Sequence, residues 1–237
     1  MTKLLLVLLM MSTASFARTV LFDEYREEIK QMTLDGHRPL TSYSQSRKYV
    51  MQNIHLDQDH KGYFVRDVYC LIQYRERISP NTMPDHTKIN IEHTWPQSRF
   101  NRSESRSYQK ADLHHLYPTN SRANSTRGNH YFNQFKNGQV LSHECQASSV
   151  GTISQTGARG FEPPEEHKGN VARALFYFAL RYNMRIPAYE EFFLRQWHLI
   201  DPVDSDELAR NDFIETVQGN RNPFIDDPDL AQLIEDF

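Results

Sequence analysis

Three residues near the middle of the chain are of types that together could cleave a phosphodiester bond. Glu92 and His93 are adjacent, and Asn124 follows His93 at an interval of 31 residues (124 − 93). An imidazole with an ordinary pKa of about 6.5 can accept a proton from water near neutral pH. Carboxylate and amide oxygens are ligands of Mg²⁺, and two of them leave positions for water and phosphate oxygens. The pattern predicts a one-metal site in which His93 is the general base and Glu92 and Asn124 bind the cation.

Arginines lie within this interval and just beyond it, and a guanidinium matches the geometry of a phosphate. Arg99, Arg102 and Arg106 lie at intervals in the polar segment that follows the Glu-His pair. Arg127 lies one helical turn beyond Asn124, so we expect both side chains on one face of a helix. A phosphate contact and an ion pair with an acidic neighbour are equally good interpretations of Arg127.

The backbone sets a condition on the Glu-His pair, because neighbours on a regular strand point to opposite faces. Glu92 and His93 enter one site only if the strand ends or twists there, and the tryptophan and proline at 95–96 favour an ending. His114 and His115 would likewise alternate across a second strand. We favour His115 as the one that faces the site, while a structural hydrogen-bonding role is the other interpretation of either histidine.

Two other functions stay open on these residues. A secreted zinc hydrolase could use His93, Asp112 and either His114 or His115, but zinc usually takes three firm protein ligands and the chain has no HExxH motif. A noncatalytic nucleic-acid-binding module is the second alternative. An intact base and ligand set argues against it, because a pure binding protein has no need of an aligned base.

The segments around these residues have the patterns of a strand, a loop, a second strand and a helix. Residues 89–93 alternate apolar and polar side chains and predict a short strand. The polar residues 97–110 predict a loop, and residues 111–117 predict the second strand, which Pro118 should end. The polar residues at 120–121 can then cap a helix that carries the amide ligand.

The rest of the chain is mainly helical by pattern. Large residues at helical spacing predict helices at 22–32, 43–54, 171–180, 189–198 and 204–218. Residues 63–71 fit a strand or a buried helix, and the segment 142–160, rich in Ser, Thr and Gly, predicts a surface loop. These elements together predict an α+β fold, rich in helices and organised as a single domain.

Length and composition also indicate one domain. A chain of 237 residues with 38% apolar residues can bury one substantial core without disulfides. Lys3, the apolar residues 4–11 and the small residue Ala17 are typical of a secretory signal peptide, with cleavage after that alanine. The apolar run is too short to span a bilayer. We expect a signal peptide at 1–17 and a single domain at 18–237, in a protein that is exported and either periplasmic or secreted.

Export affects the interpretation of the two cysteines and of the net charge. Cys70 and Cys145 would meet an oxidising compartment, so we expect a disulfide, with two free buried cysteines as the alternative.

Without Lys3 the chain has 26 basic and 30 acidic residues, a net charge of −4. Residues 88–127 nevertheless carry seven basic against three acidic residues, whereas residues 201–237 carry eleven acids against two arginines. A basic centre suits a polyanionic substrate, although such a patch also arises by chance.

Four separated segments, in this order, resemble the bacterial endonuclease I family: EHTWPQS, DLHHLYPTNSRANSTRGN, PPEEHKGNVARALFYFALRY and RNDFIETVQGNRNPFID. They are spread over most of the chain beyond the signal peptide. The resemblance implies a ββα-metal finger over about residues 89–131, related to the His-Me finger nucleases. It also implies an exported nuclease that cuts DNA, and often RNA, without sequence specificity.

Position by position, the resemblance implies that His93 is the general base and that Glu92 and Asn124 hold Mg²⁺, with Mn²⁺ or Ca²⁺ as substitutes. The expected products carry 5′-phosphate and 3′-hydroxyl ends. The resemblance also implies that an arginine between the two strands contacts phosphate. Arg99, Arg102 and Arg106 are all candidates, because this short segment has no unique alignment with the family. The expected partners are double- and single-stranded DNA and RNA, and we expect a monomer. Better-known relatives carry several disulfides, and this chain, with two cysteines, departs from them.

Overall fold

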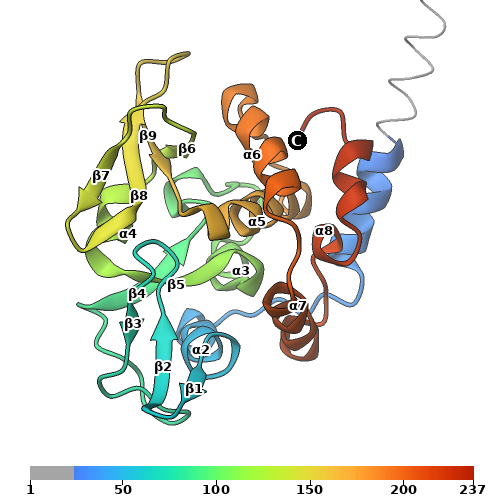
Figure 1. Ribbon diagram of the computed structural model, residues 1–237. Helices are drawn as coiled ribbons and strands as arrows, with labels where there is room; N and C mark the ends of the chain where they lie inside the picture. Colours follow the sequence, from blue (N-terminus) through green and yellow to red (C-terminus); the bar gives the residue numbers. More distant parts are fainter. Residues whose placement is uncertain (1–23) are drawn as a thin grey trace, which may run out of the picture.

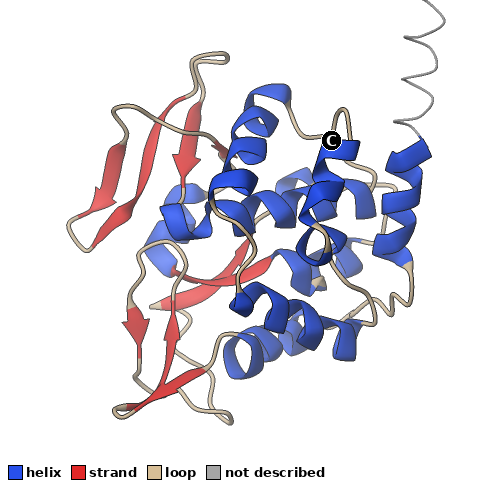
Figure 2. Ribbon diagram, turned by 45° about the vertical axis from the view of Figure 1, so that its right-hand side comes forward, coloured by secondary structure: helices blue, strands red, loops and turns tan. Residues whose placement is uncertain are grey.

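The computed structural model describes residues 24–237, so the predicted signal peptide and its cleavage site lie outside the described residues. In Figure 1 the strands lie on one side of the molecule and the long C-terminal helices on the other, and Figure 2 shows the same separation. Residues 24–34 are helical and lie beside the C-terminal segment, where Arg26 Nη1 donates to the carbonyl of Asp236 at 2.6 Å. The predicted α+β class is confirmed.

An antiparallel pair of strands forms the middle of the chain. Strand β4 (Ile89–His93) pairs with β5 (Leu116–Asn120), and helix α4 (Ser121–Arg127) follows directly. The side chain of Asn120 caps α4 by accepting two of its first backbone N–H groups at 2.9 and 3.0 Å. The predicted order of strand, connection, strand and capped helix is confirmed. Strand β4 ends at His93, which meets the condition under which Glu92 and His93 can enter one site.

The connection between these strands is more ordered than the loop predicted at 97–110. A 3₁₀ turn, η2 (Gln97–Arg99), is followed by helix α3 (Arg106–Ala111). The Ser105 side chain caps α3 by accepting from the N–H of Tyr108. A helix of six residues with one buried apolar side chain is too short for its period to show in the sequence.

The second strand begins later than predicted and continues through the proline. Residues Leu113–His115 form a 3₁₀ turn, η3, because the Asp112 side chain accepts from the N–H of His114. The two histidines therefore do not alternate across a strand, and both are buried. Pro118 lies within β5, and its carbonyl accepts from the N–H of Val68 at 2.9 Å. The prediction that this proline ends the strand is wrong, because a strand position whose nitrogen makes no ladder bond accepts proline.

Two further small sheets flank the central pair. The first is antiparallel and contains β1 (Asp57–Asp59), β2 (Gly62–Arg66) and β3 (Gln73–Tyr74). The second has the order β6-β9-β8-β7 and contains β6 (Tyr131–Phe132), β7 (Gln139–Ser142), β8 (Cys145–Thr152) and β9 (Arg159–Glu162). The prediction of a surface loop at 142–160 is therefore wrong. The buried positions of β8 are a cysteine, a serine and a valine, so composition hides the strand.

The predicted helices are present, with shifted ends. Besides the helix at 24–34, they are α2 (Tyr43–Tyr49), continued by the π-helical η1 (Val50–Ile54), α5 (Lys168–Arg181), α6 (Ala188–Ile200) and α7 (Ser205–Gln218). Asp204 caps α7 by accepting from the N–H of Glu207 at 2.8 Å, and Gly219, with φ of 83°, ends it. The shorter elements are η4 (Glu165–His167), α8 (Pro223–Asp226) and η5 (Pro228–Leu233).

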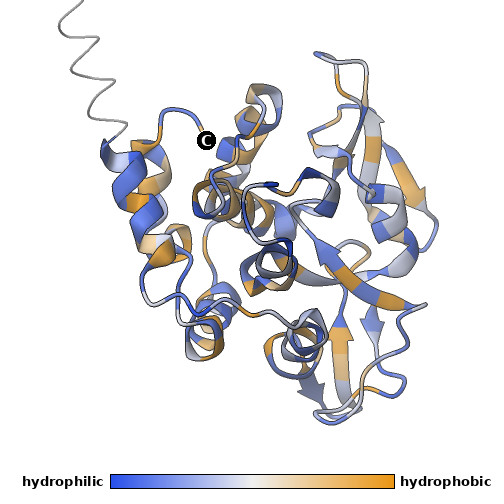
Figure 3. Ribbon diagram, turned by 180° about the vertical axis from the view of Figure 1, so that it is seen from behind, coloured by the Kyte–Doolittle hydropathy of each residue, from blue (hydrophilic) through white to orange (hydrophobic). Residues whose placement is uncertain are grey.

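Helix α5 is central and packs against η3, the turn before β5, and against Trp95, which follows β4. Its apolar side chains are all buried, as expected for a helix that is apolar on nearly every side. The ring of Phe178 stacks on Trp95 at 5.3 Å and lies 4.4 Å from the ring of His115. Figure 3 shows hydrophobic and hydrophilic residues alternating along the strands that cover this core. Within residues 24–237, no helix combines the length and the apolar character that crossing a bilayer requires.

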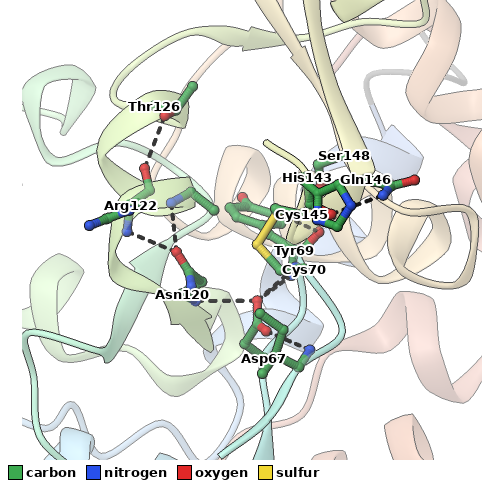
Figure 4. The surroundings of a disulfide bond; sticks show 12 residues. Asp67, Tyr69, Cys70, Asn120, Arg122, Thr126, His143, Cys145, Gln146 and Ser148 are labelled. Atoms are coloured by element: carbon green, nitrogen blue, oxygen red, sulfur yellow. Dashed lines mark hydrogen bonds between the residues drawn. A yellow bond between two sulfur atoms is a disulfide. The ribbon is translucent and has the colours of Figure 1, made fainter. Parts of the chain in front are cut away.

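The two cysteines form a disulfide, as predicted. Cys70, in the turn after β2, is bonded to Cys145 at the start of β8, across a sequence separation of 75 residues (Figure 4). The bond connects the sheet that precedes β4 with the sheet that follows α4. It therefore joins the segments on both sides of the central unit.

Candidate active site

The carboxylate of Glu92 is buried and held by two donors. Arg127 Nη1 lies 2.7 Å from its Oε1, and the hydroxyl of Tyr69 donates to the same oxygen at 2.9 Å. Burial raises the pKa of Glu92, while the positive charge of Arg127 and the hydrogen bond from Tyr69 lower it. The site therefore contains one carboxylate in a fixed orientation, whose charge is stabilised by an adjacent cationic side chain.

His93 lies in a largely closed aromatic pocket at the end of β4. Its Nε2 is 3.1 Å from the carbonyl oxygen of Lys110, which can only accept, so we assign the proton to Nε2 and the free lone pair to Nδ1. The amide nitrogen of Gln97 lies 3.4 Å from Nδ1, and the rings of Tyr43 and His115 are 5.2 and 5.3 Å from the imidazole. Burial, together with the nearby His115, lowers the pKa of His93 to about 3. The imidazole is neutral at pH 7 and has a lone pair for a proton.

Asn124 extends from α4 onto strand β4. Its Nδ2 donates to Asn90 Oδ1 at 2.7 Å and to the carbonyl of Ile91 at 3.1 Å. These two bonds use both amide hydrogens, so Oδ1 is the atom left to bind a ligand. Residues 90 and 91 immediately precede Glu92 and His93, and the helix therefore brings the predicted amide ligand to the strand that carries the other two residues.

Arg127 is buried, with 1% of its side chain exposed. Besides its ion pair with Glu92, its guanidinium donates to the carbonyls of His93, at 2.9 Å, and Thr94, at 2.5 Å. The ring of Phe132 lies 4.6 Å from the guanidinium carbon and covers it. This placement does not support a phosphate contact by Arg127; the ion pair with an acidic neighbour, our other interpretation, is the arrangement found.

The three arginines between the strands have different surroundings. The Arg99 side chain is 20% exposed, lies 3.8 Å from Glu190 and stacks over the ring of Tyr131 at 4.0 Å. Arg102 is exposed, and Arg106 is exposed while donating to the backbone and side-chain oxygens of Gln97 at 3.3 Å. Exposure makes Arg102 and Arg106 more accessible to a phosphate than Arg99.

Asp112, His114 and His115 are placed as structural groups. The Asp112 carboxylate accepts from Tyr177 at 3.0 Å and from Tyr182 at 2.8 Å, and also from Gln218 and the His114 backbone. His114 Nε2 lies 3.4 Å from the carbonyl of Asn220, and His115 Nε2 lies 2.8 Å from the carbonyl of Gln109. These contacts do not favour the zinc-hydrolase alternative, because they engage the side chains that it required.

The donor set fits a hard divalent cation. Glu92 offers an oriented carboxylate and Asn124 an amide oxygen whose own hydrogens are already used. Two such oxygens suit Mg²⁺, which keeps several waters, better than Zn²⁺, which takes three or four nitrogen, sulfur or carboxylate ligands. Among the described residues, no three His, Cys, Asp or Glu side chains converge as a metal-binding group.

Three neighbours of the site were not predicted. Tyr69 holds Glu92, Gln97 approaches the free nitrogen of His93, and Asn90 orients the amide of Asn124. Gln97 follows His93 by four residues, and this short interval is the one sequence signal that could have indicated it. Tyr69 is far from Glu92 in the chain, so its contact depends on the fold.

Comparison with known proteins places the chain in a family of nucleases. The chain belongs to the endonuclease I family, whose family profile, described as Endonuclease I, matches residues 23–229. Among curated relatives, it is 36% identical to an extracellular ribonuclease of Bacillus subtilis (strain 168), over 61% of this chain and 53% of that protein. It is 28% identical to Endonuclease-1 of Buchnera aphidicola subsp. Baizongia pistaciae (58% and 61%) and 30% identical to an extracellular deoxyribonuclease of Aeromonas hydrophila (54% and 51%). The matched region thus covers about half to three fifths of these relatives.

Proposed function

We propose that this protein is an exported, sequence-nonspecific endonuclease that hydrolyses phosphodiester bonds of DNA and RNA. The observation that carries the proposal is the contact of Asn124 with strand β4, which brings an amide oxygen to the strand that ends in Glu92 and His93. Membership of the endonuclease I family supports the same activity. The finger is assigned to residues 89–131 within a domain at 18–237, after a signal peptide at 1–17.

His93 is the general base in this proposal. The Lys110 carbonyl fixes its orientation and tautomer, so Nδ1 is the nitrogen that takes the proton from the attacking water. The burial that lowers its pKa also keeps the ring neutral before the reaction. A phosphate bound beside it adds negative charge, which raises the pKa of the imidazole and strengthens it as a base.

Glu92 and Asn124 hold the cation, for which Mg²⁺ is the proposed ion and Mn²⁺ or Ca²⁺ are substitutes. When bound, it supplies positive charge to the phosphate and to the departing 3′-oxygen. Arg127 opposes the burial that raises the pKa of Glu92, and it fixes the orientation of the carboxylate. Cleavage of the bond between phosphorus and the 3′-oxygen leaves 5′-phosphate and 3′-hydroxyl ends.

The substrate class follows from what the site can contact. Exposed arginines between the strands bind phosphate and carry little base information, so cutting should be nonspecific and sensitive to salt. The named relatives include a ribonuclease and a deoxyribonuclease, which supports both DNA and RNA as substrates. Relatives described as extracellular or periplasmic, and a disulfide, support export. We propose a monomer, because the site residues all come from one chain.

The test is degradation of plasmid DNA and of a structured RNA by the oxidised protein without its signal peptide. We expect cutting with Mg²⁺, none with excess EDTA, and ends that ligate without prior phosphorylation. Zn²⁺ in place of Mg²⁺ should not support equal activity. Retained DNA binding without cutting by folded protein would instead identify a noncatalytic binder, and zinc-dependent cutting would identify the zinc hydrolase.

A further inference from the structure

Beyond the ligands themselves, one buried tyrosine connects the cation site to the disulfide. We propose that Tyr69 is a positioning residue for Glu92, and that the Cys70–Cys145 disulfide holds Tyr69 in place. The inference rests on the proposed function, because it takes Glu92 to be a cation ligand. It concerns a residue that contacts neither the substrate nor the cation.

Tyr69 is completely buried, and its hydroxyl has a single side-chain target. The hydroxyl donates to Glu92 Oε1 at 2.9 Å, and Arg127 Nη1 approaches the same oxygen to 2.7 Å. Two donors on one oxygen fix the rotation of the carboxylate that would hold the cation. The Tyr69 ring packs against Phe161, with centroids 4.7 Å apart, so the hydroxyl is held against Glu92.

The turn that carries Tyr69 is organised by one buried carboxylate. Asp67 is fully buried and accepts from the backbone N–H groups of Tyr69 at 3.1 Å, Cys70 at 2.7 Å and Ile72 at 2.8 Å. Leu71 takes a φ of 61°, a left-handed conformation that residues with a side chain adopt only where their surroundings impose it. The turn is therefore a tight structure whose shape depends on its anchors.

Strand β8 holds the other side of the same turn (Figure 4). The Tyr69 carbonyl accepts from the hydroxyl of Ser148 at 2.8 Å, and the next residue along the chain is bonded to Cys145. Asp67 also accepts from the N–H of Asn120 at 3.2 Å, the residue that caps α4. The turn thus contacts both the carboxylate ligand and the start of the helix that carries the amide ligand.

The experiment compares cation binding by Tyr69→Phe and the wild type, using Mn²⁺ and the electron paramagnetic resonance signal of the free ion. Removing the hydroxyl should weaken Mn²⁺ binding about tenfold, as is usual for a residue that orients a metal ligand. The Mg²⁺ concentration for half-maximal cutting should rise by a similar factor, while kcat at saturating Mg²⁺ changes much less. Tyr182→Phe, which removes a buried hydroxyl from Asp112, is the matched control and should bind Mn²⁺ like the wild type.

The disulfide is tested by the same readout. The double variant Cys70→Ala/Cys145→Ala should bind Mn²⁺ more weakly than the wild type. Tyr69→Phe should then weaken Mn²⁺ binding by a smaller factor in this double variant than in the wild type. Wild-type Mn²⁺ affinity in Tyr69→Phe, or equal weakening in Tyr182→Phe, would overturn the proposal. If the wild type binds Mn²⁺ but cuts nothing, the nuclease function fails while the role of Tyr69 is still measured; if the wild type binds no Mn²⁺, the cation site itself is wrong.

Discussion

Arg127 and Glu92 form a buried ion pair, with Nη1 and Oε1 2.7 Å apart and 1% and 2% of the side chains exposed. The pair connects helix α4 to the end of strand β4. Because the same guanidinium also binds the carbonyls of His93 and Thr94, it fixes the backbone at the point where the proposed base and ligand leave the strand. Arg127 is therefore a residue on which both the stability and the activity of the protein should depend.

Arg127→Ala should lower the free energy of unfolding by about 3 to 5 kcal/mol, because it leaves Glu92 buried without its partner. Urea denaturation measures the change. Arg122→Ala, at an exposed position on the same helix, should change stability by no more than about 0.5 kcal/mol. The double variant Glu92→Ala/Arg127→Ala should recover part of the stability and none of the activity. A loss below about 1 kcal/mol in Arg127→Ala would contradict the role given to the pair.

Arg102 should contribute to substrate binding through phosphate alone. Arg102→Ala is expected to raise KM, leave kcat at saturating DNA nearly unchanged, and reduce the dependence of log binding constant on log salt concentration by about 0.9. Competition binding to duplex DNA at several salt concentrations provides the slope. Arg185→Ala, at a side chain 87% exposed near the C-terminal segment, is the control. If the salt dependence of binding is the same in Arg102→Ala as in the wild type, Arg102 does not contact phosphate, and Arg106 or Arg99 is the residue to test next.

Stability should fall as the pH is lowered from about 6.5 to 5. Burial lowers the pKa of His114 and His167 to about 3 and that of His115 to about 4, so in this range the unfolded chain binds protons that the folded chain does not. Each histidine whose pKa is lowered by folding stabilises the folded state fully at a pH above its pKa in the unfolded chain. This contribution to the free energy of unfolding is lost as the pH falls below that value. Each histidine contributes a slope of up to about 1.4 kcal/mol per pH unit.

Urea unfolding at pH 7, 6 and 5 tests this dependence. His167→Phe removes one of the buried imidazoles and should make the slope shallower by about one proton. Equal slopes in the variant and the wild type would show that this histidine takes up its proton in the folded state as well.

The disulfide should be a large part of the stability outside the site. Cys70→Ala/Cys145→Ala releases a span of 75 residues in the unfolded chain, and the loop-entropy relation gives a loss of about 4 kcal/mol. Thermal and urea unfolding of the oxidised wild type and the variant measure it. A loss below about 1 kcal/mol would mean that the unfolded chain is constrained by other means.

The sequence predicted the elements whose ends are marked by side chains. Asp204 and Gly219 delimit α7, and Asn120 caps α4, because a capping side chain and a left-handed glycine act locally. The structure bonds Asn124 to the backbone of β4, while a shared metal site of Glu92, His93 and Asn124 stays a prediction. Local chemistry and order along the chain were sufficient for these features.

Features that depend on tertiary contacts could not be predicted in this way. Within residues 142–160, strand β8 pairs with β7 and β9 and buries a cysteine, a serine and a valine, a pattern that composition does not indicate. Pro118 is accepted in β5 because its nitrogen makes no ladder bond, while its carbonyl accepts from Val68, outside the strand. Tyr69 meets Glu92 across a separation of 23 residues that only the fold closes, so neither its spacing nor its residue type could indicate a role.

The most direct test of the account is the rate of plasmid cutting by His93→Ala in saturating Mg²⁺, compared with the wild type at equal folded concentration. Removing a general base should lower the rate by a factor of about 10² to 10⁴, while Mn²⁺ binding by Glu92 and Asn124 persists. His86→Ala, at an exposed position before β4, should cut like the wild type. Undiminished cutting by folded His93→Ala would contradict the assignment of His93 as the base and, with it, the proposed mechanism.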